Sequence, residues 1–127
     1  MADRARDADG FSAAAAAVLL VLAFAPAEAA DVERGKTLYA ACAACHTEKP
    51  EALGPSLKGV VGRKSAALED FRYSNPMKRA NLTWDEPNLR AYIANPQDKV
   101  KGNRMPFGGL TSPADLDDVM AYLETLK

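Results

Sequence analysis

The chain has 127 residues, 48% hydrophobic and 26% charged, which suits one globular domain and excludes a two-domain enzyme or a disordered tail. The 16 basic side chains oppose 17 acidic ones for a formal net charge of -1, so charge gives no support for a nucleic-acid partner or for direct binding to a membrane surface. Two cysteines and one histidine are too few for a closed zinc site built from these residue types.

The N-terminal part predicts a signal peptide over residues 1–29. Residues 11–25 are an uncharged apolar stretch, and small residues follow at Ala27 and Ala29, which favours cleavage after Ala29, with Ala30 as second choice, and export to the periplasm. Two alternatives stay open. The stretch is shorter than the about 20 residues of a spanning helix, yet it could remain as an uncleaved membrane anchor. Three aspartates outnumber two arginines before it, so the true start could lie further in.

The rest of the chain predicts helices and loops, with no alternating run long enough for a sheet. Asp31 can cap a first helix that runs into the two cysteines. Proline and glycine interrupt any period across residues 47–64, which therefore predict a loop.

Two further helices follow. The capping-box pattern from Thr83 to Glu86 predicts a helix that ends at Asn95-Pro96. Residues 97–110 predict a second irregular loop. Ser112 followed by Pro113 then predicts the start of a last helix, whose apolar residues recur at helical spacing. The fold class is therefore all-α.

One motif carries chemistry: Cys42-Ala43-Ala44-Cys45-His46. It is the pattern of covalent c-type haem attachment, in which two thiols add to the haem vinyl groups and the adjacent imidazole binds iron. One helical turn separates the cysteines, so both sulfurs reach the same edge of the macrocycle. A zinc site would need another Cys or His, and a thioredoxin-like redox motif would need a βαβ context. We therefore predict one haem c, held by Cys42 and Cys45 and ligated by His46.

Beyond this motif the chain resembles the class I c-type cytochromes, a family of small electron carriers. The resemblance covers nearly all of residues 30–127, which we expect to form a cytochrome c domain of three to five helices around one covalently attached haem. The segments that carry it, in order, are Gly54-Pro55-Ser56-Leu57-Lys58-Gly59, Gly62-Arg63-Lys64, Phe71-Arg72-Tyr73-Ser74, Leu82-Thr83-Trp84, Tyr92-Ile93-Ala94-Asn95-Pro96 and Gly102-Asn103-Arg104-Met105-Pro106-Phe107.

The resemblance implies that Met105 is the second iron ligand, because it matches the axial methionine of the family. Met120 lies on the apolar stripe of the last helix, where core packing is the expected role. Met77 falls where the family has no ligand. A His46 and Met105 pair would raise the reduction potential and leave no open position for a substrate.

The resemblance also implies contacts around the haem. The carbonyl of Pro55 would fix the ring of His46. Arg63, Tyr73 and Trp84 would bind a haem propionate, and the Tyr92 hydroxyl would approach the methionine sulfur. The first and last helices would cross at Gly35, Tyr39, Val119 and Tyr122.

Three departures from the family concern the methionine loop and its surface. Lys101 stands where relatives usually have proline, which frees φ and adds an amine. Asn103 replaces the usual threonine. Gln97 and Asp98 dilute the lysine ring used for docking, although four basic residues can still rim the haem edge: Lys58, Lys99, Lys101 and Arg104.

These features predict a monomeric, non-enzymatic carrier that moves single electrons between redox proteins. The expected partners are membrane respiratory or photosynthetic complexes, docked only transiently, and periplasmic oxidoreductases. The alternative function is a catalytic or ligand-sensing haem protein, either a small peroxidase or a gas sensor. Both need an open iron position, which Met105 would fill.

Overall fold

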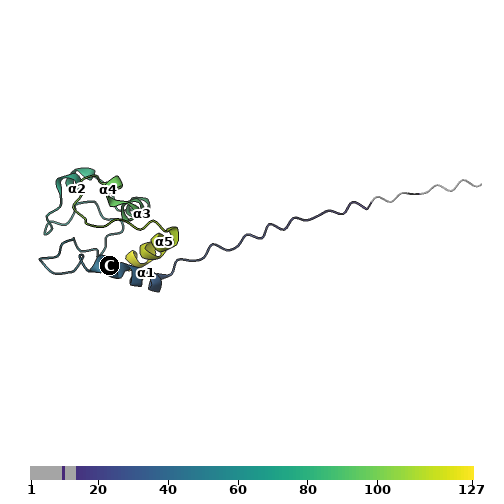
Figure 1. The fold of residues 1–127 in the computed structure, drawn as a ribbon, viewed down its shortest axis with the longest axis horizontal. Helices are drawn as coiled ribbons and strands as arrows, with labels where there is room; N and C mark the ends of the chain where they lie inside the picture. Colours follow the sequence, from purple (N-terminus) through teal and green to yellow (C-terminus); the bar gives the residue numbers. More distant parts are fainter. Residues whose placement is uncertain (1–9, 11–13) are drawn as a thin grey trace, which may run out of the picture.

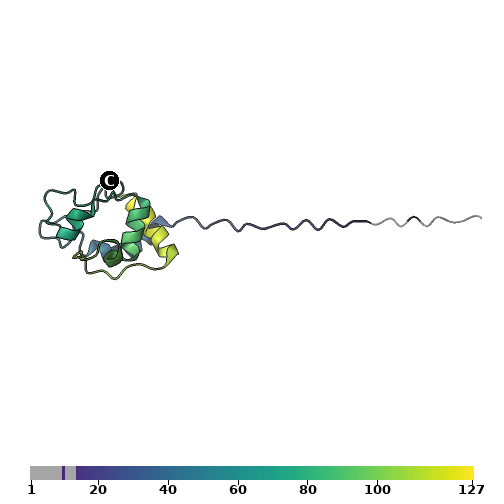
Figure 2. The same ribbon diagram turned by 90° about the horizontal axis from the view of Figure 1, so that it is seen from above.

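The computed structural model describes residues 10 and 14–127. Of the predicted signal peptide over residues 1–29, positions 1–9 and 11–13 therefore lie outside the described residues. Residues 14–30 are exposed chain without helix and run away from the helical domain in both views (Figures 1 and 2). Within the described residues, no helix is both long enough and apolar enough to cross a membrane.

The domain is all-α, as predicted. Five helices appear in the described residues, in the order α1 Val32–Ala43, α2 Asn75–Ala80, α3 Glu86–Ala94, α4 Pro96–Lys99 and α5 Pro113–Leu123. The described residues pair in β fashion only at an isolated bridge between Lys64 and Thr83. The long segment between α1 and α2 contains no helix, in agreement with the predicted loop.

Helices α1 and α5 pack against each other and join the two ends of the domain (Figure 1). Gly35 is buried at the crossing, where an added Cβ would lie 1.9 Å from the Asp118 carbonyl oxygen. Only glycine therefore lets the two backbones approach so closely. The rings of Tyr39 and Tyr122 pack with centroids 4.9 Å apart, and Val119 is fully buried.

Helix α3 begins two residues later than predicted. Its cap is Asp85, whose side chain accepts from the Asn88 N–H, and not Thr83. The reason is Pro87. With Thr83 as the cap, Pro87 would be the fourth helical residue, and the first helical hydrogen bond would be lost because proline has no N–H. With Asp85 as the cap, Pro87 lies in the first turn, where the backbone N–H has no helical partner in any case.

The predicted loop over residues 97–110 is wrong at its start, because Pro96–Lys99 forms the short helix α4. Asn95 both ends α3 and caps α4, with its side chain accepting from the Asp98 N–H. Helix α2, capped by Ser74, had no counterpart in the sequence pattern. Helix α5 begins at Pro113 with Ser112 as its cap, as predicted.

The core lies between α3, α5 and the loops that follow α1 and α4. Met120 is 3% exposed, in agreement with its predicted packing role. The buried apolar residues are Val60, Trp84, Leu89, Tyr92, Ile93, Val100, Leu116, Val119, Met120 and Leu123. Leu57, Met77, Met105 and Phe107 pack against this cluster from the loops and α2.

Candidate functional site

The two cysteines lie at the end of α1. The N–H groups of Cys45 and His46 both donate to the Cys42 carbonyl, at 3.1 and 3.0 Å, so the chain continues as a tight turn past the helix. Both thiols are free and partly buried. Burial raises the pKa of the Cys42 thiol, with a further rise from Cys45. The turn places both thiols next to His46 in the sequence and in space.

The His46 ring is held from two sides. Its Nδ1 lies 2.7 Å from the Pro55 carbonyl oxygen, which can only accept, so Nδ1–H donates and Nε2 keeps a lone pair for a metal. Burial lowers the pKa of His46, the Pro55 carbonyl raises it, and the charge of Arg63 lowers it. On the other side an added Cβ at Gly54 would lie 2.5 Å from the ring atom Cε1.

Gly54 is a site residue that sequence reasoning missed. Its N–H donates to the Cys45 carbonyl at 3.0 Å, which brings its backbone against the imidazole. In the sequence, Gly54 is one of the residues that interrupt any period across residues 47–64, and nothing in the local pattern indicates that a ring packs where its side chain would be. Only the distance between Gly54 and His46 in the fold reveals it.

Arg63 and Trp84 are brought together by backbone pairing. The Trp84 N–H donates to the Arg63 carbonyl at 2.7 Å. The Arg63 guanidinium donates to the carbonyls of Ser56 at 2.8 Å and Lys58 at 3.1 Å. These bonds use two of its five N–H groups and leave the others free to bind an anion.

Tyr73 lies on a different loop from that pair. Its hydroxyl accepts from the Leu68 N–H at 3.3 Å, and its ring packs edge-on against Phe71 with centroids 4.9 Å apart. The structure thus joins two members of the predicted propionate-binding set, Arg63 and Trp84, through their backbone and holds the third by separate contacts.

Met105 is half-buried in the loop between α4 and α5 and packs against the core. Tyr92 belongs to the same core, its ring lying 5.0 Å from that of Trp84 between centroids. Burial raises the pKa of Tyr92 to about 12, so its hydroxyl keeps its proton throughout the physiological range. The predicted contact of this hydroxyl with the methionine sulfur stays a prediction.

The loop that carries Met105 is held by Asn103, whose role the sequence did not indicate. Asn103 is one of two polar or charged residues that are buried in the part of the chain that the structure describes, and it is 8% exposed. Its Oδ1 accepts from the Met105 N–H at 2.8 Å. The signal available in the sequence was an asparagine two residues before the methionine, a spacing at which side-chain amides bond the backbone.

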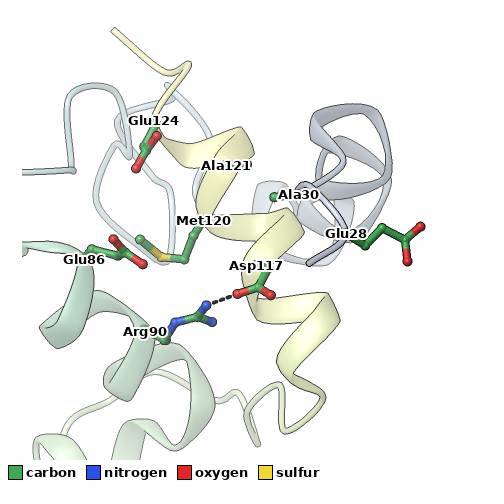
Figure 3. A pocket seen from close by; sticks show the side chains of 8 residues that line it. All are labelled: Glu28, Ala30, Glu86, Arg90, Asp117, Met120, Ala121 and Glu124. Atoms are coloured by element: carbon green, nitrogen blue, oxygen red, sulfur yellow. Dashed lines mark hydrogen bonds and ion pairs between the residues drawn. The ribbon is translucent and has the colours of Figure 1, made fainter. Parts of the chain in front are cut away.

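A separate hollow lies beside α3 and α5 (Figure 3). Arg90 forms an ion pair with Asp117 across it, and Met120 lines it. None of the predicted haem residues lines this hollow.

These residues fit a haem c. Two free thiols and an imidazole whose Nδ1 is bonded to the Pro55 carbonyl lie at the end of α1, and a thioether lies on a distant loop. Among residues 10 and 14–127, no three or more His, Cys, Asp or Glu side chains are grouped to hold a metal ion by themselves.

Comparisons with known proteins point the same way. The family model "Cytochrome c" matches residues 32–127. Cytochrome c2 iso-2 of Magnetospirillum molischianum is 45% identical over 100 residues, covering 77% of this chain and 100% of that protein. Cytochrome c2 of Rhodoblastus acidophilus is 45% identical over 102 residues, covering 78% and 95%. The solved structure of cytochrome cH from Methylobacterium extorquens aligns with a TM-score of 0.71 and 40% identity, covering 75% of this chain and 98% of that one.

Proposed function

This chain belongs to the cytochrome c family, whose cofactor is one haem c, and from this premise we propose that it carries single electrons between redox proteins. The observation that carries the proposal is the grouping of Cys42, Cys45 and His46 at the end of α1, with the ring of His46 fixed by Pro55. When bound, the haem supplies an iron that changes by one electron between its ferric and ferrous states.

The protein attaches the haem and orients the side chains that bind it. Cys42 and Cys45 would hold the haem by thioether bonds, each thiol giving its sulfur to one vinyl carbon and its hydrogen to the other. His46 offers Nε2, because Pro55 engages Nδ1 and Gly54 leaves room for the ring. Met105 offers its thioether as the second ligand. Arg63, Tyr73 and Trp84 offer donors to a propionate, and Tyr92 lies in the same core.

Mass spectrometry of the denatured protein after acid-acetone extraction tests the attachment. We expect one haem mass on the mature chain, and none on a Cys42→Ser, Cys45→Ser double variant. A parent chain from which the haem extracts freely contradicts the proposal.

Ligation by both His46 and Met105 leaves no open iron position, which favours a carrier over a peroxidase or gas sensor. Carbon monoxide added to the ferrous protein therefore changes its spectrum little, whereas the Met105→Ala variant binds it. Prompt binding by the parent protein would favour the sensing or catalytic alternative.

We further propose that residues 1–29 are a signal peptide, that residues 30–127 act in the periplasm as a monomer, and that partners dock transiently. The support is the apolar stretch over residues 11–25, followed by small residues at Ala27 and Ala29. N-terminal sequencing of the periplasmic protein is expected to begin at Ala30. An intact N-terminus found in the membrane fraction would instead identify an anchored cytochrome.

A further inference from the structure

The loop that carries Met105 has no helix between α4 and α5, so its shape depends on other bonds. The side chain of Asn103 makes three of them. Its amide donates to the carbonyls of Pro96 at 2.9 Å and Val100 at 2.8 Å, and its Oδ1 accepts from the Met105 N–H at 2.8 Å. One buried side chain thus connects the start and the end of α4 to the backbone of the methionine.

Gln97 supports the same arrangement from α4. Its Nε2 donates to the Asn103 carbonyl at 3.0 Å, and its Oε1 accepts from the Gly102 N–H at 3.2 Å. The amide side chains of Gln97 and Asn103 together fix the loop backbone at Gly102, Asn103 and Met105. Gln97 therefore has a structural role here, apart from any effect on the docking surface.

The far end of the loop is anchored independently. The Leu110 N–H donates to the Ile93 carbonyl at 2.9 Å, and an added Cβ at Gly109 would lie 2.1 Å from the Ala94 carbonyl oxygen. The loop is therefore pinned to α3 at one end and to α4 at the other. Met105 lies nearer the α4 end, two residues from Asn103, so the Asn103 contacts govern its backbone most directly.

We propose that Asn103 is a positioning residue that holds the Met105 sulfur at the iron, acting through the Met105 N–H, with Gln97 as its support. The inference rests on the proposed ligation by Met105. Removing the Asn103 amide leaves the Met105 N–H without its acceptor. The carbonyls of Pro96 and Val100 lose one of two donors and keep the backbone N–H groups of Val100 and Asn103. The loop then opens more readily, and a competing ligand replaces the methionine more easily.

The test is an imidazole titration of the ferric holoprotein, followed by loss of the methionine-sulfur to iron charge-transfer band. A tenfold change in affinity corresponds to about 1.4 kcal/mol, and one buried hydrogen bond contributes a free energy of that order. We therefore expect Asn103→Ala to bind imidazole about tenfold more tightly than the parent. Asn103→Ser supplies a hydroxyl that can accept a hydrogen bond from the Met105 N–H, so we expect its imidazole affinity to lie between those of Asn103→Ala and the parent. Gln97→Ala falls between Asn103→Ala and the parent.

Asp118→Asn is the matched control, since Asp118 is also polar and buried, at 7% exposed, and acts at the crossing of α1 and α5. We expect its imidazole affinity to stay near that of the parent. Equal effects of Asn103→Ala and Asp118→Asn would mean general loosening and would overturn the proposal, as would an unchanged affinity in Asn103→Ala. Hydrogen exchange adds a readout independent of iron, with the Met105 N–H exchanging faster in Asn103→Ala than in Asn103→Ser.

The proposed ligation by Met105 and the positioning role of Asn103 are contradicted by different results. If the parent protein lacks the charge-transfer band, Met105 is not the ligand, and the positioning role of Asn103 is contradicted with it. A parent with the band and an unresponsive Asn103→Ala variant leaves the ligand in place and removes only the positioning role.

Discussion

At the scale of single residues, the His46 ring is oriented by a hydrogen-bond acceptor and by an absent side chain. Pro55 engages Nδ1 at 2.7 Å, while Gly54 provides the space in which the ring lies. A hydrogen bond alone would leave the ring free to tilt about it. The close backbone at Gly54 limits that tilt, so the direction of Nε2 depends on both residues.

Gly54→Ala tests this steric role. A methyl group placed 2.5 Å from Cε1 must displace the ring or the loop, and overpacking of this kind costs about 1–3 kcal/mol. We expect a lower free energy of unfolding of the holoprotein in denaturant and a lower yield of protein with covalent haem. Gly108→Ala is the control, because nothing lies within 4 Å of its added Cβ. Equal behaviour of the two variants would contradict the role of Gly54.

At the scale of elements, α1 and α5 are joined by charge as well as by close packing. Asp118 accepts from the Asp31 N–H at 2.7 Å and from Arg34 at 2.6 Å, and Arg34 also pairs with Asp115. Asp31 itself caps α1 through the Arg34 N–H. The carboxylate of Asp118 therefore connects the start of the first helix to the last helix.

The pH dependence of stability follows from Asp118. The Asp31 N–H, and then Arg34, lower the pKa of this carboxyl below its ordinary value. Its stabilising effect is thus fully present above the unfolded pKa of about 3.9 and is lost as the pH falls through the lower folded value.

We expect the parent to be more stable than Asp118→Asn at neutral pH and the difference to vanish in acid, as measured by denaturant unfolding at each pH. Asp117→Asn is the control, because the Asp117 side chain is 47% exposed against 10% for Asp118, and ion pairs open to water contribute little. A difference between parent and Asp118→Asn that persists below both pKa values would rule out the charge as its source.

The methionine loop gives a second prediction at this scale. Lys101 is exposed, and Val100 before it has φ -133 and ψ 84, which is outside the α region that a following proline disfavours. In the part of the chain that the structure describes, the Lys101 N–H donates to no acceptor, so Lys101→Pro costs no hydrogen bond there, and it removes conformations from the open loop. This contributes about 0.4–1 kcal/mol to the closed state.

Amines bind iron only after losing a proton, so high pH favours replacement of Met105 by lysine. Since one pH unit corresponds to about 1.36 kcal/mol, we expect Lys101→Pro to move the alkaline loss of the charge-transfer band upward by about 0.3–0.7 units. Lys101→Ala removes the amine without constraining the backbone and separates the two effects. An unchanged midpoint in Lys101→Pro would show that neither the Lys101 amine nor loop freedom controls the transition.

At the scale of the whole molecule, charge is almost balanced. From residue 31 onward the chain has 14 basic and 13 acidic side chains, a formal charge of +1 before any propionate is counted. Acidic residues gather around the hollow beside α3 and α5 (Figure 3). Basic residues, including Lys101 and Arg104, lie on the methionine loop. Long-range steering of a partner is consequently weak, and local pairs at the docking surface dominate.

Strong electrostatic steering raises association rates by at least about tenfold, and salt removes this gain. We therefore expect the rate of electron transfer to a partner complex to change by less than about tenfold between low and physiological ionic strength. Stopped-flow kinetics across a salt series measures it. Lys101→Gln is expected to reduce the remaining slope more than Lys36→Gln on α1. A steep fall of rate with salt would show that the basic residues form a stronger docking surface than their number indicates.

The sequence by itself determined the features that depend on neighbouring residues. The spacing of Cys42, Cys45 and His46, the cap at Ser112 and the apolar stripe through Met120 each fit within a few turns of chain, and local geometry sets their outcome. The start of α3 was misplaced because two caps compete within three residues, and Pro87 decides between them. The roles assigned by resemblance to Arg63, Tyr73 and Trp84 stay predictions.

Only the tertiary structure decided what lies against what. Gly54 against His46, Gly35 against Asp118, and Asn103 between α4 and Met105 are contacts that no periodicity encodes. In the first two pairs the glycine is needed because it has no Cβ. The sequence does not show this need, because it arises only when another part of the folded chain occupies the space of that atom. Asn103 matters because its loop has no regular hydrogen bonds, so a buried side chain must supply them, and which backbone groups it reaches depends on how α3, α4 and the core bring the chain together.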